Sequence, residues 1–391
     1  MYKHRKLVLL AGIVTFSLVV LGSPKFPSFR VSAKLALRAV PGLVILFHHE
    51  ENQPVIVTPG DFNGDGKADL VIGSLWDNEY SNELTLFPGR GDGTFGAPVV
   101  TKLHARPQAA QTADFNGDGI SDLAVVTNSQ AVGGEGRLWM FLGAKSGPLR
   151  KSYSVPLPET PSAVFVADFD RDGTPDVAVS SWAYGFWVLR GRGDGTFEDA
   201  RLACRCPVYL VADFNGDGLP DLVSRDGDYE SVRMNRGDGT FSPSIAFSGQ
   251  GLTPGVEFRE PVAAADLNGD RIPDLVFANR RVPGLSVYLG HGDGTFHAAG
   301  SLAAAEVHAI RIADVNGDGF PDILAAVWRR SRGELLIFPG LGNGTFGRAI
   351  PVRTGYTPSD IGIADFNLDR KLDFAVSSLG GQSVSVFLQD R

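Results

Sequence analysis

The chain has 391 residues, including 48 Gly, 24 Pro and only 2 Cys, and its formal net charge is −8. Two cysteines are too few for a disulfide-rich scaffold, and the sequence has no basic stripe of the kind that binds nucleic acid. The length allows one large domain or two ordinary ones, and the glycine and proline content is typical of a β protein with many turns.

The N-terminal segment has the composition of an export signal. The basic stretch MYKHRK precedes an uncharged apolar run from Leu7 to Leu21. This pattern predicts a signal peptide over residues 1–22. Counted through Pro24, the uncharged run is 18 residues long, which also suits an uncleaved membrane anchor. Either alternative exports the rest of the chain to the periplasm, the cell surface or the medium, and residues 23–42 follow as a linker.

An acidic pattern of nine residues recurs seven times after the linker. The first copy is DFNGDGKAD, and the first aspartates of successive copies lie 45 to 54 residues apart. These first aspartates are Asp61, Asp114, Asp168, Asp213, Asp266, Asp314 and Asp365. A regular period of this size predicts a repeat architecture.

A second motif, related to GRGDGTF, keeps step with the first. Its five clear copies lie at Gly89–Phe95, Gly191–Phe197, Asn235–Phe241, Gly290–Phe296 and Gly340–Phe346. Asp-Gly and Asn-Gly between strand-like runs predict tight hairpin turns. Three copies contain Arg-Gly-Asp, and we interpret each as part of the repeating turn and not as an adhesion signal.

Each repeat is therefore predicted to hold four antiparallel strands, with the acidic loop between strands 1 and 2 and the tight turn between strands 3 and 4. Seven such units predict an all-β, seven-bladed β-propeller over residues 43–391. The last repeat stops after its third strand, while LVILFHH at 43–49 lies where other repeats carry a fourth strand. We expect this N-terminal strand to close the last blade, which removes two free sheet edges.

The acidic loops start like an EF-hand calcium loop but lack its glutamate at position 12. Side-chain oxygens at positions 1, 3, 5 and 9 and the carbonyl at position 7 are expected to bind up to seven Ca²⁺. The predicted ligands are Asp61, Asn63, Asp65, Lys67, Asp69, Asp114, Asn116, Asp118, Ile120, Asp122, Asp168, Asp170, Asp172, Thr174, Asp176, Asp213, Asn215, Asp217, Leu219, Asp221, Asp266, Asn268, Asp270, Ile272, Asp274, Asp314, Asn316, Asp318, Phe320, Asp322, Asp365, Asn367, Asp369, Lys371 and Asp373. These loops contain half of the 44 acidic residues, so the negative charge reflects metal ligands and says little about partners.

The seven sites are expected to differ in affinity. Loops 5 and 7, which begin at Asp266 and Asp365, carry Arg271 and Arg370 at position 6, where the other loops have glycine. If that position is left-handed, as in an EF-hand, the arginines should make these the weakest sites. In an alternative interpretation the arginines adopt a different turn and lie across the loop as counter-ions. Loop 3 has four aspartates and should bind most tightly, although Arg171 at its position 4 offsets part of that gain.

The two motifs together resemble the FG-GAP/VCBS repeat family, whose propellers include the integrin α-subunit head and many exported bacterial proteins. The resemblance covers residues 43–391 and implies calcium in the loops, an extracellular location and binding of proteins or glycans. It does not fix the ligand, since some related propellers are polysaccharide-active enzymes. We expect a non-enzymatic, adhesion-type binding module, because the sequence has no hydrolase, zinc-protease or phosphate-binding motif. A lyase-like enzyme on the same scaffold is the alternative.

Antiparallel strands place the acidic loops and tight turns on one face and the variable connections on the other. The partner is therefore expected on the face opposite the calcium loops, where aromatic and arginine side chains gather. The candidates are Trp76, Tyr80, Trp182, Tyr184, Tyr229, Arg280, Arg281, Trp328, Arg329, Arg330 and Tyr356. Trp139 and Trp187 lie in third strands and are expected between blades. Cys204 and Cys206 are expected as free thiols, although a turn between them would allow a bridge.

Overall fold

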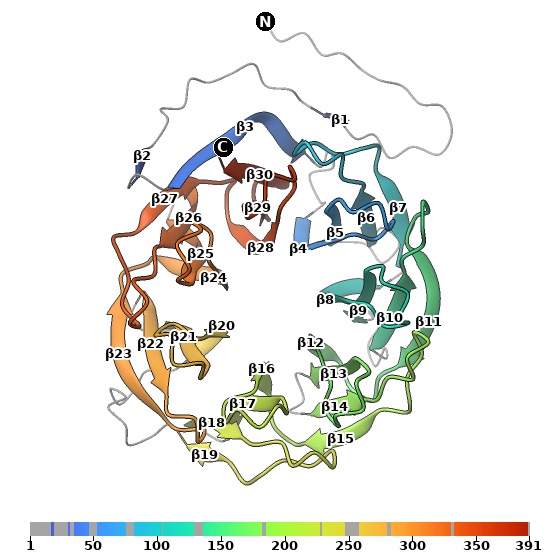
Figure 1. The fold of residues 1–391 in the computed structure, drawn as a ribbon. Coiled ribbons are helices and arrows are strands. Elements are labelled where there is room, and N and C mark those ends of the chain that lie inside the picture. Colours follow the sequence, from blue (N-terminus) through green and yellow to red (C-terminus); the bar gives the residue numbers. More distant parts are fainter. Residues whose placement is uncertain are drawn as a thin grey trace, which may run out of the picture.

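The computed structural model shows a ring of seven four-stranded antiparallel sheets, each with its first strand toward the central axis (Figure 1). It describes residues 53–75, 82–103, 105–128, 136–181, 185–226, 229–246, 258–279, 283–329 and 332–389, together with the strand segments 17–18, 30–31 and 35–46. Apart from residues 17–18, the predicted signal or anchor lies outside these residues, and so does half of the predicted linker. Within the described part, the chain forms no helix that is long and apolar enough to cross a membrane.

The first four blades follow one another along the chain. Blade 1 contains β4 (Gln53–Gly60), β5 (Asp69–Leu75), β6 (Glu83–Phe87) and β7 (Val99–Lys102). Blade 2 contains β8 (Arg106–Ala113), β9 (Asp122–Asn128), β10 (Arg137–Leu142) and β11 (Arg150–Pro156). Blade 3 contains β12 (Pro161–Ala167), β13 (Asp176–Ser181), β14 (Phe186–Leu189) and β15 (Arg201–Cys204). Blade 4 contains β16 (Val208–Ala212), β17 (Asp221–Asp226), β18 (Tyr229–Arg233) and β19 (Ile245–Ala246).

The last three blades complete the ring. Blade 5 contains β20 (Phe258–Ala265), β21 (Asp274–Asn279), β22 (Leu285–Gly290) and β23 (Phe296–Leu302). Blade 6 contains β24 (Glu306–Ala313), β25 (Asp322–Arg329), β26 (Arg332–Phe338) and β27 (Ile350–Arg353). Blade 7 contains β28 (Pro358–Ala364), β29 (Asp373–Ser378), β30 (Ser383–Gln389) and the N-terminal strand β3 (Leu35–Leu46).

The N-terminal strand closes the ring as predicted. β3 pairs antiparallel with β30, with Leu37 opposite Gln389 and Leu46 opposite Ser383. The strand begins at Leu35, earlier than the apolar run alone indicates. Two short strands, β1 (Ser17–Leu18) and β2 (Arg30–Val31), also pair with β3. The first and last parts of the chain therefore share one sheet (Figure 1).

The hydrophobic core lies between the blades. Among the described residues it divides into seven clusters, and each joins residues of two neighbouring blades. Second strands such as β13 are buried along their whole length, since both of their faces meet a neighbouring sheet. Trp139 and Trp187 are only half-buried at these junctions, so the expectation that they lie fully between blades is only partly met.

The expectation of free thiols is wrong, because Cys204 and Cys206 form a disulfide. The strand β15 ends at Cys204 and the chain bends through residues 205–206. This bend brings the two Cα atoms to 5.4 Å, within the usual range for a disulfide, whereas continued strand would have kept them farther apart.

Candidate metal centres

The first aspartate of each acidic loop organises the loop backbone. In loop 2, Oδ1 of Asp114 accepts the N–H groups of Gly117 at 2.8 Å and Asp118 at 3.1 Å. Oδ2 of the same carboxylate accepts the N–H of Gly119 at 2.8 Å. Short polar side chains that bond to nearby backbone groups form such turns from local sequence alone. The chain therefore folds back over the position 1 carboxylate, and the side chains at positions 3 and 5 lie near it.

Position 6 is left-handed in all seven loops, which meets the condition on which the weaker binding of loops 5 and 7 was expected. Arg271 has φ of 69° and Arg370 has φ of 68°, close to the 80° of Gly119. Both arginines also donate their backbone N–H to the position 1 aspartate at 2.8 Å, as the glycines do. The alternative in which they adopt a different turn is therefore wrong.

Position 4 is a second left-handed position, which the sequence analysis missed. Five loops have glycine there, but loop 3 has Arg171 at φ 62° and loop 7 has Leu368 at φ 58°. A residue with a Cβ costs about 1–2 kcal/mol in this conformation. Loop 7 carries such residues at both positions and is the most strained of the seven. A glycine at position 4 of the other five loops was the signal that could have revealed this.

The aspartate at position 9 has a structural role that sequence reasoning did not find. In blade 1, Oδ2 of Asp69 accepts the N–H of Phe62 at 3.0 Å, and Oδ1 accepts the N–H of Gly89 at 2.7 Å. All seven equivalents are fully buried and make the same pair of bonds. Each therefore joins the acidic loop to the first residue of the 3–4 turn. In blades 2 and 7, which lack the turn motif, the aspartate bonds instead to the residue after the third strand or at its end, Gly143 or Gln389.

Burial dominates the protonation of these position 9 carboxyls. It raises the pKa of each from 3.8 to about 6, against the opposing effect of the two backbone hydrogen bonds. Aspartates at positions 1 and 5 of the same loop raise the pKa further, and in loop 3 those at positions 3 and 5 do so. A bound divalent cation would reverse this effect, because it stabilises the ionised form.

Loop 3 gathers carboxylates most closely. Oxygen atoms of Asp168, Asp170 and Asp176 lie within 4.8 Å of one another, a separation that a single ion could bridge. Arg190 pairs with Asp170 at 3.1 Å, so a cation already faces this cluster. Arg171 was expected to offset part of the calcium affinity of loop 3. Its guanidinium instead pairs with Asp217 of loop 4 at 3.4 Å.

The loops fit a hard cation that prefers oxygen ligands. The side chains at positions 1, 3, 5 and 9 supply carboxylate and amide oxygens, and no nitrogen or sulfur ligand is needed. In loops 1 and 6 the position 3 amide bonds to position 9, and in loops 2, 4, 5 and 7 it bonds to position 5. These four positions are therefore neighbours in space. Flexible oxygen sites of this kind suit Ca²⁺ better than Mg²⁺.

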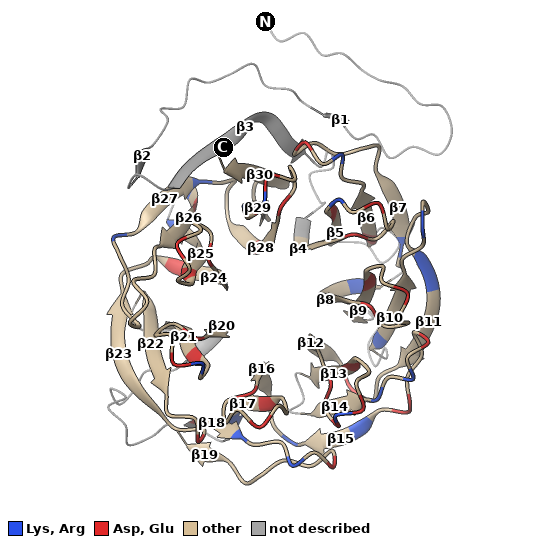
Figure 2. Cartoon of the chain, viewed as in Figure 1, with Lys and Arg blue, Asp and Glu red and all other residues tan. Residues whose placement is uncertain are grey.

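The acidic loops and the tight turns share one face, as predicted, and they connect neighbouring blades. Gly93 in the turn of blade 1 donates its N–H to the carbonyl of Phe366 in loop 7 at 2.9 Å. Comparable bonds reach the loop of the preceding blade at six of the seven junctions between described blades. Acidic residues recur in these loops around the whole ring (Figure 2).

The sequence of the repeats matches a known family. The profile of the FG-GAP-like repeat matches residues 61–125, 114–179, 213–277, 266–325 and 314–376, more than half of the chain. The chain belongs to the FG-GAP-like repeat family. The FG-GAP resemblance seen in the sequence is thus confirmed.

Several curated proteins are similar to parts of this FG-GAP-like chain. T-cell immunomodulatory protein of Rattus norvegicus is 26% identical over 302 residues, covering 66% of this chain and 45% of that protein. Cartilage acidic protein 1 of Mus musculus is 30% identical over 189 residues, covering 42% and 28%. Integrin alpha-IIb of Homo sapiens is 30% identical over 147 residues, covering 32% and 14%. The chain spans less than half the length of these relatives.

Similarity to a solved structure supports the propeller fold of this FG-GAP-like chain. The BP39L lectin of Burkholderia pseudomallei superposes with a TM-score of 0.65 at 14% identity, covering 86% of this chain and 96% of the lectin. At this identity the likeness concerns the propeller architecture and carries no information on ligands.

The opposite face of this FG-GAP-like propeller is described only in part. Trp328 at the end of β25 meets Tyr356, with ring centroids 5.9 Å apart and planes at 87°. Tyr356 is 43% exposed. Arg329 pairs with the buried Glu334 at 3.2 Å. Tyr229 begins β18, but its side chain is not described. The other predicted residues of this face lie outside the described residues: Trp76, Tyr80, Trp182, Tyr184, Arg280, Arg281 and Arg330.

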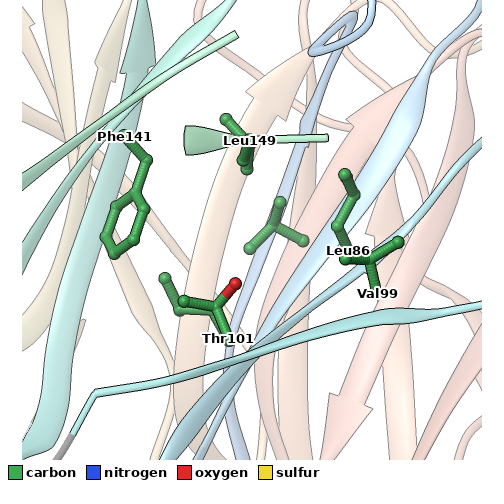
Figure 3. A pocket seen from close by; sticks show the side chains of 7 residues that line it. Leu86, Val99, Thr101, Phe141 and Leu149 are labelled. Carbon is green, nitrogen blue, oxygen red and sulfur yellow. The ribbon is translucent and has the colours of Figure 1, made fainter. Parts of the chain in front are cut away.

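A small gap of about 10 Å³ lies between blades 1 and 2 (Figure 3). It is lined by apolar side chains, among them Leu86, Phe141 and Leu149, and by Thr101. A volume of this size holds about one water molecule. The gap has no titratable group and is a packing defect without features of an active site.

Proposed function

We propose that this protein is an exported, calcium-stabilised propeller that binds a protein or glycan partner on the face opposite the acidic loops. In this proposal Ca²⁺ is structural and holds loop, turn and neighbouring blade together, and the protein has no catalytic activity. The name of one similar protein, an integrin, supports a binding role. The family relationship and the export-type N-terminus support a location outside the cytosol.

The proposed binding site rests on a difference between the side chains of the two faces. Motif residues of the loop face are committed to bonds within and between blades. The opposite face holds the exposed Tyr356 against Trp328, beside an arginine held by a buried glutamate. Aromatic and arginine side chains of this kind are the usual anchors of interfaces, and flat aromatic rings also suit sugars.

The calcium part is tested by titrating Ca²⁺ into chelator-treated protein by calorimetry. With a dissociation constant near 10⁻⁴ M, each site would add about 1.4 kcal/mol of stability at millimolar calcium. We expect heat from several sites and a rise in the thermal midpoint. Absence of both would contradict the proposal. Asp168→Asn with Asp170→Asn should remove the tightest site.

The binding part is tested by screening the calcium-loaded protein on a glycan array and on extracellular protein panels. Trp328→Ala with Tyr356→Ala should abolish any signal found. Leu341→Ala is the matched control, since Leu341 is 55% exposed in the tight turn of the same blade, on the loop face. If only Leu341→Ala loses binding, the partner binds the loop face and the proposed site on the opposite face is wrong. Shortening of a bound polysaccharide would favour the enzyme alternative.

A further inference from the structure

Two histidines meet on the tight turn of blade 5. Nδ1 of His297 lies 3.3 Å from Nε2 of His291, and the rings stack with centroids 4.9 Å apart. Both side chains are exposed. Neither histidine takes part in the acidic loop or in the core, so the proposed function does not account for the pair.

The turn itself sets the separation. Gly290 pairs with Phe296, and the N–H of His291 donates to the carbonyl of Thr295 at 3.0 Å. His291 and His297 are thus diagonal neighbours on the same face of the hairpin, a placement that brings long side chains together. The hairpin is anchored by Phe296, which is buried, so the backbone positions of both histidines are fixed.

The nitrogen separation matches that of two ligands on one metal ion. Nitrogen ligands lie about 2.0–2.1 Å from zinc, and a tetrahedral angle then puts two of them about 3.3–3.4 Å apart. A direct N–H···N hydrogen bond between the rings would be long at 3.3 Å. The stacked rings, with planes 27° apart, do not aim both lone pairs at one point, so metal binding requires the exposed imidazoles to rotate about the Cβ–Cγ bond.

We propose that His291 and His297 form a two-histidine site for a borderline transition-metal ion such as Zn²⁺, with water completing the coordination. Imidazole suits zinc and copper, whereas the oxygen-rich acidic loops suit calcium, so the two kinds of site discriminate by ligand chemistry. Asp293 adds a negative charge nearby. Hydrogen bonds from Thr295 hold the pKa of Asp293 below its usual range, and His291 contributes to the same shift.

The other turns provide internal controls. The positions of His291 and His297 are occupied by Arg90 and Gly96 in blade 1. The blade 1 turn has the same backbone bond, from the N–H of Arg90 to the carbonyl of Thr94 at 2.9 Å. A Cβ at Gly96 would meet nothing closer than 3.5 Å, so this position accepts a Cβ without a clash. The pair can therefore be transplanted.

The test is a calorimetric titration of Zn²⁺ into protein saturated with Ca²⁺. Loss of a supporting partner costs about 10–100-fold in metal affinity, so His291→Asn and His297→Asn, which each remove a ligand, should weaken zinc binding at least about tenfold. His308→Asn, which alters a histidine paired with Glu306 at 3.9 Å in blade 6, should leave it unchanged. Arg90→His with Gly96→His should add one further zinc site.

The proposal is overturned if the native chain shows no zinc binding in the presence of calcium, or if neither His291→Asn nor His297→Asn changes it. It is also overturned if the blade 1 double variant folds but adds no site, since the turn geometry would then be insufficient. All of these results are independent of the proposed partner binding, which uses the opposite face.

Discussion

Single residues at left-handed positions differentiate otherwise equivalent loops. Arg271 and Arg370 sit where five loops have glycine, and they keep the glycine-like turn at φ of 69° and 68°. These arginines are therefore expected to weaken calcium binding in two ways. Each places a Cβ in an unfavourable backbone conformation, and each places a positive charge near the proposed ion. Loop 7 bears the additional strain of Leu368, although the side chain of Leu368 packs over Gly91 in the turn of blade 1.

Substitution at Arg370 separates the two parts. Arg370→Ala removes the charge and keeps the Cβ, whereas Arg370→Gly removes both. We expect glycine to tighten calcium binding by about tenfold or more, because 1.4 kcal/mol is one decade in affinity, and alanine to achieve only part of this. A calcium titration of each variant measures the difference. Equal effects of alanine and glycine would show that backbone strain contributes nothing.

The buried position 9 aspartates predict an unusual pH dependence for the calcium-free protein. Burial raises their pKa in the folded state to about 6, above the ordinary 3.8, so the folded state holds these protons more tightly than the unfolded state does. Their contribution to stability is therefore full below about pH 4 and is lost as the pH rises through 6.

Thermal unfolding with and without calcium tests this sign. In chelator, the midpoint should fall between pH 5 and pH 7.5 by at least about 2 °C, since one pKa unit is worth about 1.4 kcal/mol. With saturating calcium the fall should disappear, because the ion stabilises the carboxylates. A calcium-free midpoint that rises with pH across this range would refute the assignment.

At the scale of strands and turns, the acidic loop of one blade and the tight turn of the next blade contact each other. The hydrophobic residue at position 2 of a loop packs into the cluster it shares with the next blade, and the turn phenylalanine of that blade meets it. Phe366 and Phe95 contact edge to face at 5.6 Å, and Phe214 and Phe296 do so at 5.5 Å. Where a blade has the turn motif, its phenylalanine can therefore pack against the loop of the preceding blade.

The third strands offer a matched pair of tryptophans. Nε1 of Trp139 donates to Thr127 at 2.9 Å, and Lys151 lies 3.7 Å from the ring centroid. Nε1 of Trp187 is buried and has no hydrogen-bond partner. Trp139→Phe should cost about 1 kcal/mol of unfolding free energy through the lost bond, while Trp187→Phe should be neutral or stabilising. Urea unfolding measures both, and the reverse order would show that the strand environments are misplaced.

At the scale of the whole molecule, stability depends on closure of the ring between blades 7 and 1. Strand β3 covers the edge of β30, and Asp360 of blade 7 links its neighbours on both sides. Its carboxylate accepts the N–H of Val57 in blade 1 at 3.0 Å and pairs with Arg311 of blade 6 at 2.6 Å. Removing the closing strand would leave a free edge that can pair with another chain.

Truncation tests the closure directly. A chain that starts at residue 47 should unfold at a lower temperature and associate as its concentration rises, whereas one that starts at residue 35 should behave as the parent. Light scattering after size exclusion and a thermal scan report both properties. A stable monomer that starts at residue 47 would show that β3 is dispensable.

The repeat number, the all-β propeller and its N-terminal closure could be predicted from the amino-acid sequence. These features depend on turn chemistry and strand periodicity, which involve residues close together in the chain. The contacts between residues farther apart became visible only in the folded chain. Asp69 reaches Gly89 in blade 1 and Asp221 reaches Asn235 in blade 4, at different spacings along the chain, so no fixed pattern could reveal the bond. The bend that joins Cys204 to Cys206 and the stacking of His291 on His297 likewise depend on where a strand ends and on which side chains share a face.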